Sequence, residues 1–586
     1  MRYKNKNKIH STGSVFTICQ NCKKEFTIEP EDFGFYEKIK VPPPTFCPDC
    51  RFQRRASYRN DRNIFRNKSA KSGVSIFSLY SISSGVTVYD EDEWRSDNWD
   101  ALSYGKAYDF SRTFFNQLHE LALSVPRPAR SVLNNINCDY CVNVGTSKNC
   151  YLFCNSSGSE NCMYGNNVIF SKECLEGSHS NKCEKCYELF WNESCYGTNF
   201  SSLCKNCVNV KFSENCIGCT DCLACVNLRG QKYSIFNKQY SREGYFEQLK
   251  QYKLDTWSGV CEMRKLSQDF FKKFPVRYLQ GINNLHVTGE YISYSKNIYK
   301  SYIIAGSENI RYSQYLLESP AEDSMDITIW GENTDLCYEH AICGLGISNS
   351  KFCVETWTQI TNCEYCMFCR NISDCFGCVG LKNKKYCILN VQYTKEEYEQ
   401  LVDKIKKHMN EMPYVDKNKN IYRYGEFLPV EHSPFGYNTS IVSEHFPLSR
   451  EEVISLGYPW QESEKREYAT NFSTKDIPDS IKDVDDLILD KIISCHECTK
   501  AYKIMPNELS FLRKEEIPIP RSCVDCRYKT RINQRNPFKL WHRTCMCDKA
   551  THFHGEKKCE VEFETSYAPD RPEIVYCEKC YQQEVY

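Results

Sequence analysis

The sequence has no excess of charge of either sign. Its 75 Lys and Arg residues are balanced by 75 Asp and Glu residues in a chain of 586. A molecule without a net field has no general attraction for nucleic acid or for an anionic membrane, so any charge signal must be local. The sequence also has no run of eighteen apolar residues, which excludes a hydrophobic membrane-spanning helix from the predicted elements.

The common catalytic motifs are also missing. No Gly-rich phosphate loop, dinucleotide fingerprint, His-Glu-x-x-His or Gly-x-Ser-x-Gly occurs, which disfavours the enzyme classes that are easiest to identify. The stretch from Met1 to His10 is polar and Lys-rich, with no apolar segment of a secretory signal behind it. We therefore expect a cytoplasmic protein with reduced thiols, in which 38 cysteines indicate metal binding or buried packing.

Four cysteines near each end of the chain share one spacing. Both sets read C-x2-C-x24-C-x2-C, since 47 minus 22 and 523 minus 498 both give 25. Four thiolates in two close pairs match the tetrahedral preference of zinc. The sequence therefore predicts two structural zinc modules, with the ligands Cys19, Cys22, Cys47, Cys50 and Cys495, Cys498, Cys523, Cys526.

The two modules are copies of one another. Five further identities lie 476 positions apart, namely Pro44/Pro520, Arg51/Arg527, Arg55/Arg531, Arg59/Arg535 and Asn60/Asn536. Chance does not explain so many matches in one register.

A third zinc module is predicted at the C-terminal end. Its firm ligands are Cys559, Cys577 and Cys580, while the leading position of the first knuckle is Glu556. The fourth ligand must therefore come from nearby, and the candidates are His554, Cys547, Cys545 and His552. An open fourth position would instead suit catalytic zinc.

The phrases Phe46-Cys-Pro-Asp-Cys-Arg51 and Tyr576-Cys-Glu-Lys-Cys-Tyr581 resemble those of uncharacterised bacterial zinc-ribbon or treble-clef proteins. The last stretch is similar to the C-x2-C-x17-C-x2-C zinc-binding domain family. This resemblance covers the two ends, together roughly a quarter of the chain, and implies small zinc modules without naming an activity.

The same frame of two, seventeen and two intervening residues fits Ser69, Ser72, Asp90 and Glu93. Hydroxyls and carboxylates without thiolate or imidazole partners are poor zinc ligands. We interpret this segment as a knuckle that holds no zinc; a chance match on an acidic loop is the alternative.

The middle of the chain carries a regular cysteine repeat. Motifs of the type S-x-x-C end at Cys150, Cys162, Cys174, Cys183, Cys195, Cys204 and Cys216, with steps of 12, 12, 9, 12, 9 and 12. Alternating steps of 12 and 9 predict a coil of about 21 residues in a β-solenoid, in which cysteine ladders fill a narrow core.

The segment that carries this cysteine repeat has a second copy later in the chain. Ser147-Lys-Asn-Cys150 and Ser159-Glu-Asn-Cys162 correspond to Ser295-Lys-Asn-Ile298 and Ser307-Glu-Asn-Ile310. Because isoleucine fills a core but binds no metal, the ladder cysteines are predicted to serve packing. Each solenoid should end in a capping helix, with Ser241 and Thr394 as N-caps.

Two dense knots, Cys216 to Cys225 and Cys363 to Cys378, have several cysteines three residues apart. Neither has the C-x3-C-P ending of the bacterial ferredoxin run. An iron-sulfur cluster, a further zinc ion and ladder packing remain alternatives, with packing favoured.

Basic side chains follow both zinc frameworks, interleaved with aromatic residues. Such a stripe suits phosphate contact and base stacking. The alternative is a solvated helix face paired with acids such as Glu29 to Asp32, Glu515 and Glu516. The predicted nucleic-acid contacts are Arg51, Arg54, Arg55, Arg59, Arg62, Arg527, Arg531 and Arg535.

The sequence thus predicts a multidomain, mainly β protein in which two tandem solenoids are flanked by treble-clef or zinc-ribbon modules. The predicted boundaries are zinc module 1 at 1–68, the metal-free knuckle and an aromatic connector at 69–130, solenoid 1 at 131–255, a helical connector at 256–280, solenoid 2 at 281–408, a linker at 409–490, zinc module 2 at 491–544 and zinc module 3 at 545–586.

The favoured function is a non-enzymatic scaffold with about three structural zinc ions, which binds nucleic acid or a protein partner. A metal- or thiol-dependent redox enzyme and a disulfide-laddered surface protein are the alternatives.

Overall fold

The computed structural model describes residues 8–9, 13–317, 320–462 and 468–586. The chain divides into two compact units, each assembled from segments far apart in the sequence. Unit 1 consists of 1–130, 279–462 and 538–540, and unit 2 of 131–278, 463–537 and 541–586. Each unit thus combines one solenoid with zinc modules from elsewhere in the chain. None of the helices in the described part is both long and apolar enough to cross a membrane.

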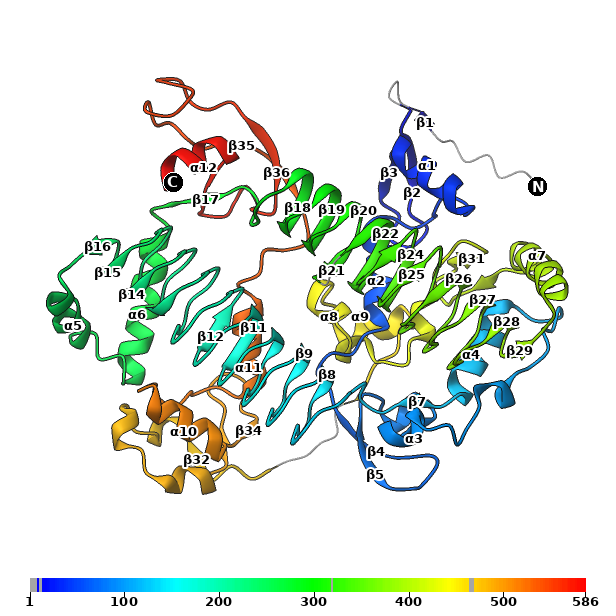
Figure 1. Cartoon of the computed structure of the whole chain (residues 1–586), viewed down its shortest axis with the longest axis horizontal. Helices are drawn as coiled ribbons and strands as arrows, with labels where there is room; N and C mark the ends of the chain where they lie inside the picture. Colours follow the sequence, from blue (N-terminus) through cyan, green and yellow to red (C-terminus); the bar gives the residue numbers. More distant parts are fainter. Residues whose placement is uncertain (1–7, 10–12, 318–319, 463–467) are drawn as a thin grey trace. The chain divides into compact units, whose positions relative to one another are not determined.

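Unit 2 contains a parallel β-solenoid (Figure 1). Its strands are β8 (Val142–Gly145), β9 (Cys154–Ser157), β10 (Asn166–Ile169), β11 (Leu175–Asn181), β12 (Tyr187–Phe190), β13 (Val208–Lys211), β14 (Thr220–Leu223) and β15 (Lys232–Ile235), closed by the antiparallel β16 (Lys238–Gln239). Strand partners are offset by twelve residues, as in Val142↔Cys154 and Val208↔Thr220. The predicted coil of about 21 residues is therefore wrong: the coil has twelve.

A three-residue rhythm explains this length. Every third residue from Ser131 to Phe236 has a positive φ, so each coil of twelve has four left-handed corners. The residue after a corner points inward, and the core of this solenoid is built from such positions, including Cys150, Cys162 and Cys174. Two cysteines twelve residues apart therefore lie on the same side of successive coils, whereas two cysteines nine residues apart lie on different sides.

The thiols inside the solenoid lie close to backbone carbonyl oxygens. The Sγ atom of Cys207 lies 3.4 Å from the carbonyl oxygen of Lys205 and 3.3 Å from that of Cys216, in the next coil. Ser201 Oγ lies 3.0 and 3.3 Å from the equivalent oxygens of Asn199 and Val210. Cysteine therefore acts as a small apolar residue with a weak donor that always finds a carbonyl. All 38 cysteines are free thiols, so the disulfide ladder of the third alternative is not observed.

The solenoid of unit 1 is more irregular. Its strands are β18 (Leu285–Ser293), β19 (Lys296–Ala305), β20 (Glu308–Arg311), β21 (Gln314–Leu316), β22 (Ala321–Trp330), β23 (Thr334–Asp335), β24 (Tyr338–Cys343), β25 (Ile347–Ser348), β26 (Ile360–Glu364), β27 (Ser373–Phe376), β28 (Lys385–Ile388) and the antiparallel β29 (Val391–Gln392). Coils grow to fourteen residues between Ile310 and Ser324 and return to twelve between Cys363 and Cys375. Ile298 and Ile310 are paired and buried, as the comparison with Cys150 and Cys162 predicted.

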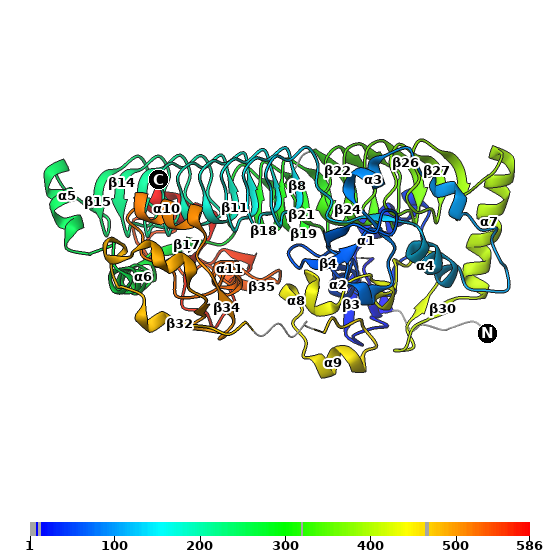
Figure 2. The same ribbon diagram turned by 90° about the horizontal axis from the view of Figure 1, so that it is seen from below.

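Helices close both solenoids as predicted. In unit 2, α5 (Arg242–Lys250) begins at Ser241, whose side chain accepts a hydrogen bond from Gly244 N, and α6 (Trp257–Phe271) follows. In unit 1, α7 (Lys395–Glu411) begins at Thr394 with a capping box to Glu397. Figure 2 shows α7 beside the last strands of its solenoid, where it covers β28. These helices protect the end coil from pairing with another strand.

The remaining elements of unit 1 lie along its solenoid. They are β1 (Lys8–Ile9), β2 (Val15–Ile18), β3 (Glu25–Ile28), α1 (Pro30–Ile39), α2 (Pro48–Ser57), β4 (Phe65–Lys68), β5 (Ser75–Ser78), β6 (Val88–Tyr89), α3 (Glu91–Arg95), α4 (Phe114–Ser124), β7 (Arg127–Pro128), β30 (Tyr414–Val415), β31 (Ile421–Tyr422), α8 (Val442–His445) and α9 (Arg450–Ser455).

The described parts of the predicted linker, 409–462 and 468–490, contribute to packed cores. Val430, Tyr437, Ile441 and Val453 form a core cluster with Phe52 of α2. Farther along, Ile477, Ile481, Val484 and Ile488 belong to the core of unit 2. The segment is polar overall, and its few buried apolar residues are widely spaced, so its composition did not predict this packing. The segment also contains the short helix α9, whose N-cap is Ser449.

The remaining elements of unit 2 are β17 (Pro275–Arg277), β32 (Phe472–Ser473), β33 (Ile493–Ser494), β34 (Ala501–Tyr502), α10 (Pro506–Lys514), α11 (Val524–Ile532), β35 (Trp541–Thr544), β36 (Glu562–Thr565), β37 (Ile574–Tyr576) and α12 (Glu578–Val585). Strand β17 pairs with β37, which ties the third zinc module to the chain that leaves the solenoid.

The corner geometry yields a first prediction. Asn149 has φ 53°, whereas Lys148 is an exposed strand position that pairs with Glu160. We expect Asn149→Val to cost about 1–2 kcal/mol, because a β-branched side chain is strained in the left-handed region. Lys148→Val, one residue earlier, should be close to neutral. Thermal unfolding of the two variants checks this, and equal shifts would contradict the three-residue rule.

Candidate metal centres and the module interface

Each zinc framework is a knuckle followed by the start of a helix. The second pair of each module begins α2, α11 or α12, with Cys47, Cys523 and Cys577 at the N-cap positions. The backbone N–H of these three residues lies 3.3, 3.2 and 3.1 Å from the Sγ of Cys19, Cys495 and Cys545 respectively. Helix N-termini and backbone N–H donors both stabilise thiolates, which are the form that binds zinc.

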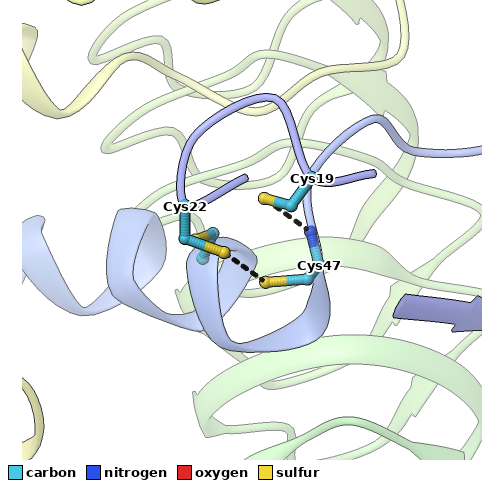
Figure 3. A group of neighbouring side chains, drawn as sticks. Cys19, Cys22 and Cys47 are labelled. Atoms are coloured by element: carbon cyan, nitrogen blue, oxygen red, sulfur yellow. Dashed lines mark hydrogen bonds between the residues drawn. The ribbon is translucent and has the colours of Figure 1, made fainter. Parts of the chain in front are cut away.

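The predicted ligands of modules 1 and 2 converge. Cys19, Cys22, Cys47 and Cys50 form one group of ligand atoms, all within 4.8 Å of one another, and Cys495, Cys498, Cys523 and Cys526 form another. Figure 3 shows Cys19, Cys22 and Cys47 around a common centre.

The sulfur separations match a tetrahedral ion. The Cys22–Cys47 Sγ distance is 3.7 Å, and the Cys495–Cys526 and Cys498–Cys523 distances are 3.9 and 3.6 Å. A tetrahedral zinc ion with Zn–S bonds of about 2.3 Å requires edges of about 3.8 Å. The thiols of these groups are therefore spaced so that each group could hold a metal ion.

The cluster environment also favours ionised sulfur at Cys495. Burial raises the pKa of this thiol, but hydrogen bonds from the backbone N–H groups of Cys523, Cys498 and Glu497 outweigh that effect and bring the pKa down to about 7. A thiolate is thus accessible near neutral pH before any metal enters.

In module 3, Cys545 completes the four-thiolate group with Cys559, Cys577 and Cys580. The Cys559 and Cys577 sulfurs are 3.9 Å apart. The open position weighed for a catalytic zinc is thus filled by a residue fourteen positions before Cys559. The other fourth-ligand candidates, Cys547, His552 and His554, gather in a separate group that also includes Cys580.

The segment from Ser69 to Glu93 has the hydrogen-bond pattern of a knuckle. Ser69 O accepts from Gly73 N at 2.9 Å, as Cys19 O accepts from Lys23 N at 3.1 Å. Asp90 N lies 3.4 Å from Ser69 Oγ, as Cys47 N does from Cys19 Sγ, and Asp90 is the N-cap of α3. Ser69 also donates to Glu93. Hydroxyl and carboxylate groups thus hold this segment together, and the absence of zinc here stays a prediction.

The cysteine knots show ladder packing. In both knots the cysteines are buried and each Sγ lies near a backbone carbonyl oxygen. This holds for Cys216, Cys219, Cys222 and Cys225 in the first knot and for Cys363, Cys366 and Cys369 in the second. In the described part of the chain, neither knot belongs to a group whose ligand atoms all approach within 4.8 Å.

The basic stripes are inside the units rather than on their surface. Arg51, Arg54, Arg55 and Arg59 are between 0% and 5% exposed, and Arg527 and Arg531 are 5% and 2% exposed. Arg62 and Arg535 are half-buried and hold contacts of their own. These six buried arginines therefore do not form a solvent-facing basic surface, and nucleic-acid binding by the chain stays a prediction.

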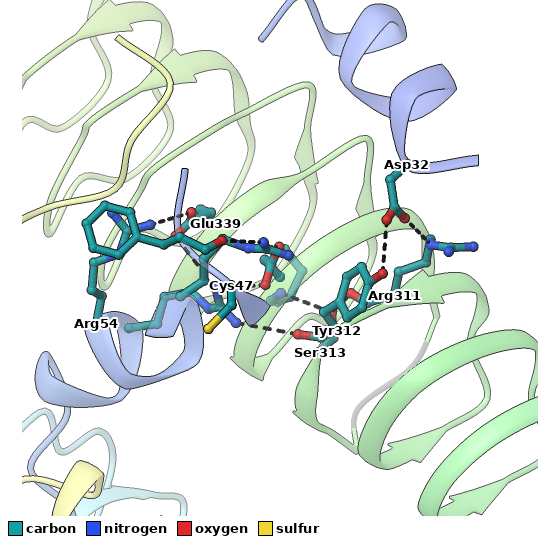
Figure 4. Close-up of polar contacts among 12 residues, drawn as sticks. Asp32, Cys47, Arg54, Arg311, Tyr312, Ser313 and Glu339 are labelled. Atoms are coloured by element: carbon teal, nitrogen blue, oxygen red, sulfur yellow. Dashed lines mark hydrogen bonds and ion pairs between the residues drawn. The ribbon is translucent and has the colours of Figure 1, made fainter. Parts of the chain in front are cut away.

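In unit 1 the arginines of α2 pair with carboxylates on the solenoid. Arg51 Nε lies 2.8 Å from Asp326 Oδ2, and Arg55 Nη1 lies 3.0 Å from Asp326 Oδ1. Arg54 lies 2.9 Å from both Glu339 and Glu426 (Figure 4). Asp326 and Glu339 are completely buried corner residues of β22 and β24.

Unit 2 repeats the arrangement with the second copy of the module. Arg527 and Arg531 of α11 both form ion pairs with Glu176, a completely buried corner residue of β11. Arg527 also lies 3.1 Å from Glu508 of α10. The partners given for Arg527 and Arg531 are thus Glu176 and Glu508, not the nearby acids Glu515 and Glu516 considered from the sequence.

A tyrosine contact recurs in both interfaces. Tyr312 donates to Asp32 at 2.9 Å in unit 1, and Tyr164 donates to Glu508 at 2.8 Å in unit 2. The Arg51 guanidinium lies 5.3 Å from the Tyr312 ring, and that of Arg527 lies 5.2 Å from the Tyr164 ring. Asp32 and Glu508 are again 476 positions apart, so the two acids occupy equivalent positions in the duplicated modules.

No protein-family model matches the chain, and no curated protein sequence matches it. Among solved structures, a crystal structure from Desulfovibrio desulfuricans G20, named an acetyltransferase, is similar over 39% of this chain and 64% of that chain, at 8% identity. The match spans just under two thirds of that structure, and its TM-score of 0.10 carries no conclusion about fold or function. The resemblance to zinc-ribbon proteins stays a prediction.

The interface gives a second prediction. Glu176→Gln leaves Arg527 and Arg531 without their shared buried counter-charge, so we expect a loss of about 3–5 kcal/mol of stability. The matched control is Glu160→Gln on the same solenoid, whose partner Lys148 is 3.7 Å away and exposed. This control should cost less than about 1 kcal/mol. Urea unfolding followed by tryptophan fluorescence compares them, and similar costs would show that the interface pair is not energetically distinct.

Proposed function

We propose that the protein is a zinc-dependent, non-catalytic scaffold. Zinc folds the small terminal modules, and the helix that begins at each of the first two metal centres anchors its module to a solenoid. The observation that carries this proposal is the duplicated interface, in which α2 and α11 place equivalent arginines on buried corner carboxylates.

The donor sets support a structural role for the metal. Three groups each provide four thiolates, a closed tetrahedral set that leaves no position for a substrate. In modules 1 and 2 the helix that carries two of the thiolates also carries the interface arginines, as Cys50 and Arg51 of α2 are neighbours. Loss of the ion would therefore release the arginines from the geometry that their buried carboxylates require.

The solenoid is the part of the scaffold best suited to present a surface to a partner. Its outward corners form polar ladders, such as Asn137 to Asn149 at 3.2 Å and Asn149 to Asn161 at 3.0 Å. Six of the eight arginines predicted to contact nucleic acid form ion pairs with carboxylates, so these six are not part of this proposal.

The test is zinc removal from the full chain, followed by hydrogen exchange. We expect amides of α2 and α11 to lose protection after chelation, while the solenoid strands keep theirs, because the coils need no metal. Cys22→Ser should expose α2 and Cys498→Ser should expose α11.

The matched control is Cys261→Ser, which changes an exposed thiol of α6 outside every metal group. It should leave the exchange pattern unchanged. Unaltered protection of α2 and α11 in the metal-free protein would refute the proposal, as would purified protein without zinc.

A further inference from the structure

The third zinc module contains more metal ligands than one ion uses. Cys545, Cys559, Cys577 and Cys580 form one group, and Cys547, His552, His554 and Cys580 form a second. The ligand atoms within each group all lie within 4.8 Å of one another, and Cys580 belongs to both. Two thiolates with two imidazoles are, like four thiolates, a common set for structural zinc.

A ring nitrogen of His552 and one of His554 both lie close to the sulfur of Cys547. His552 Nδ1 lies 3.1 Å from Cys547 Sγ, and His554 Nε2 lies 3.4 Å from the same atom. A thiol has a single hydrogen and satisfies only one of these nitrogens. The other nitrogen lone pair would need a donor other than Cys547, whereas one metal ion accepts both lone pairs.

The opposite ring nitrogens are held as they are in metal-binding histidines. His554 Nδ1 lies 2.6 Å from the carbonyl oxygen of Lys557, which can only accept, so Nδ1 carries the hydrogen and Nε2 keeps its lone pair. His552 Nε2 lies 3.4 Å from the Glu584 carboxylate, which leaves Nδ1 as its ligand atom. Such second contacts to carbonyl and carboxylate groups orient histidine ligands and select the tautomer that binds.

Charge gives an independent reason for a second ion. The module contains five cysteines that are completely or almost completely buried, namely Cys545, Cys547, Cys559, Cys577 and Cys580. Five thiolates carry −5; one Zn²⁺ leaves −3, and two leave −1. Buried charge is costly unless it is compensated, so the second ion allows all five sulfurs to be ionised.

We propose that module 3 holds two zinc ions, bridged by the Cys580 thiolate. One ion is bound by Cys545, Cys559, Cys577 and Cys580, and the other by Cys547, His552, His554 and Cys580. Sulfur has enough lone pairs to bond both ions. The inference rests on the proposed zinc binding and raises the expected content of the chain from three ions to four.

Metal content tests the second ion. Zinc-loaded full-length protein should contain four ions per chain, and His554→Ala and His552→Ala should each contain three. His554→Cys supplies a thiolate instead and should restore four. The matched control is His542→Ala, which changes an exposed histidine of β35 that lies near Glu562 and Glu564. This variant should keep four ions.

Three ions in the unaltered protein, or four in His554→Ala, would overturn the second site while leaving the proposed scaffold intact. A chain without zinc would refute both.

Cobalt replacement tests the bridge. In full-length protein loaded with Co²⁺, the ions of modules 1 and 2 should give full paramagnetic resonance intensity, while coupling through Cys580 should weaken the signal of the pair. His554→Ala should restore full intensity for its three ions. Four uncoupled cobalt signals in the unaltered protein would exclude a shared thiolate.

Discussion

The structure depends on one electrostatic arrangement, the buried pairing of arginines on a helix that begins at a cysteine cluster with carboxylates at the corners of a solenoid. Removing a guanidinium group from water is costly unless a carboxylate meets it with good geometry. Asp326 meets both Arg51 and Arg55, and Glu176 meets both Arg527 and Arg531. The position of each module on its coil is therefore specified by charge as well as by shape.

The coil itself is a compromise between backbone strain and close packing. A corner every three residues forces most side chains at those positions into the left-handed region, which costs energy outside glycine and, to a lesser degree, asparagine. The narrow interior that results accepts small side chains with weak donors, which explains why cysteine and serine alternate along it. In unit 1, isoleucine also fits a coil of twelve residues, since Ile298 and Ile310 are buried strand partners at that offset.

Much of this was predictable because it is local. The paired cysteine spacings predicted the first two metal centres, and Ser241 and Thr394 predicted the starts of the capping helices. The solenoid class was also predicted, but the coil length was wrong, because steps of 9 and 12 were added although they describe different sides of one coil. The core cysteines of the unit 2 solenoid all fall at multiples of three in the numbering, and that simpler signal would have led to twelve residues.

The amino-acid sequence by itself determined the ligand pairs, the duplicated modules, the helix caps and the small interior residues, since each is encoded within a few positions. Only the tertiary structure decided that Arg54 is buried, that Cys545 completes the third thiolate group and that Cys580 belongs to two groups. The physical reason is that a spacing specifies which side chains a short segment presents. Whether water, a distant carboxylate or a second ligand set meets them depends on which segment packs against that surface.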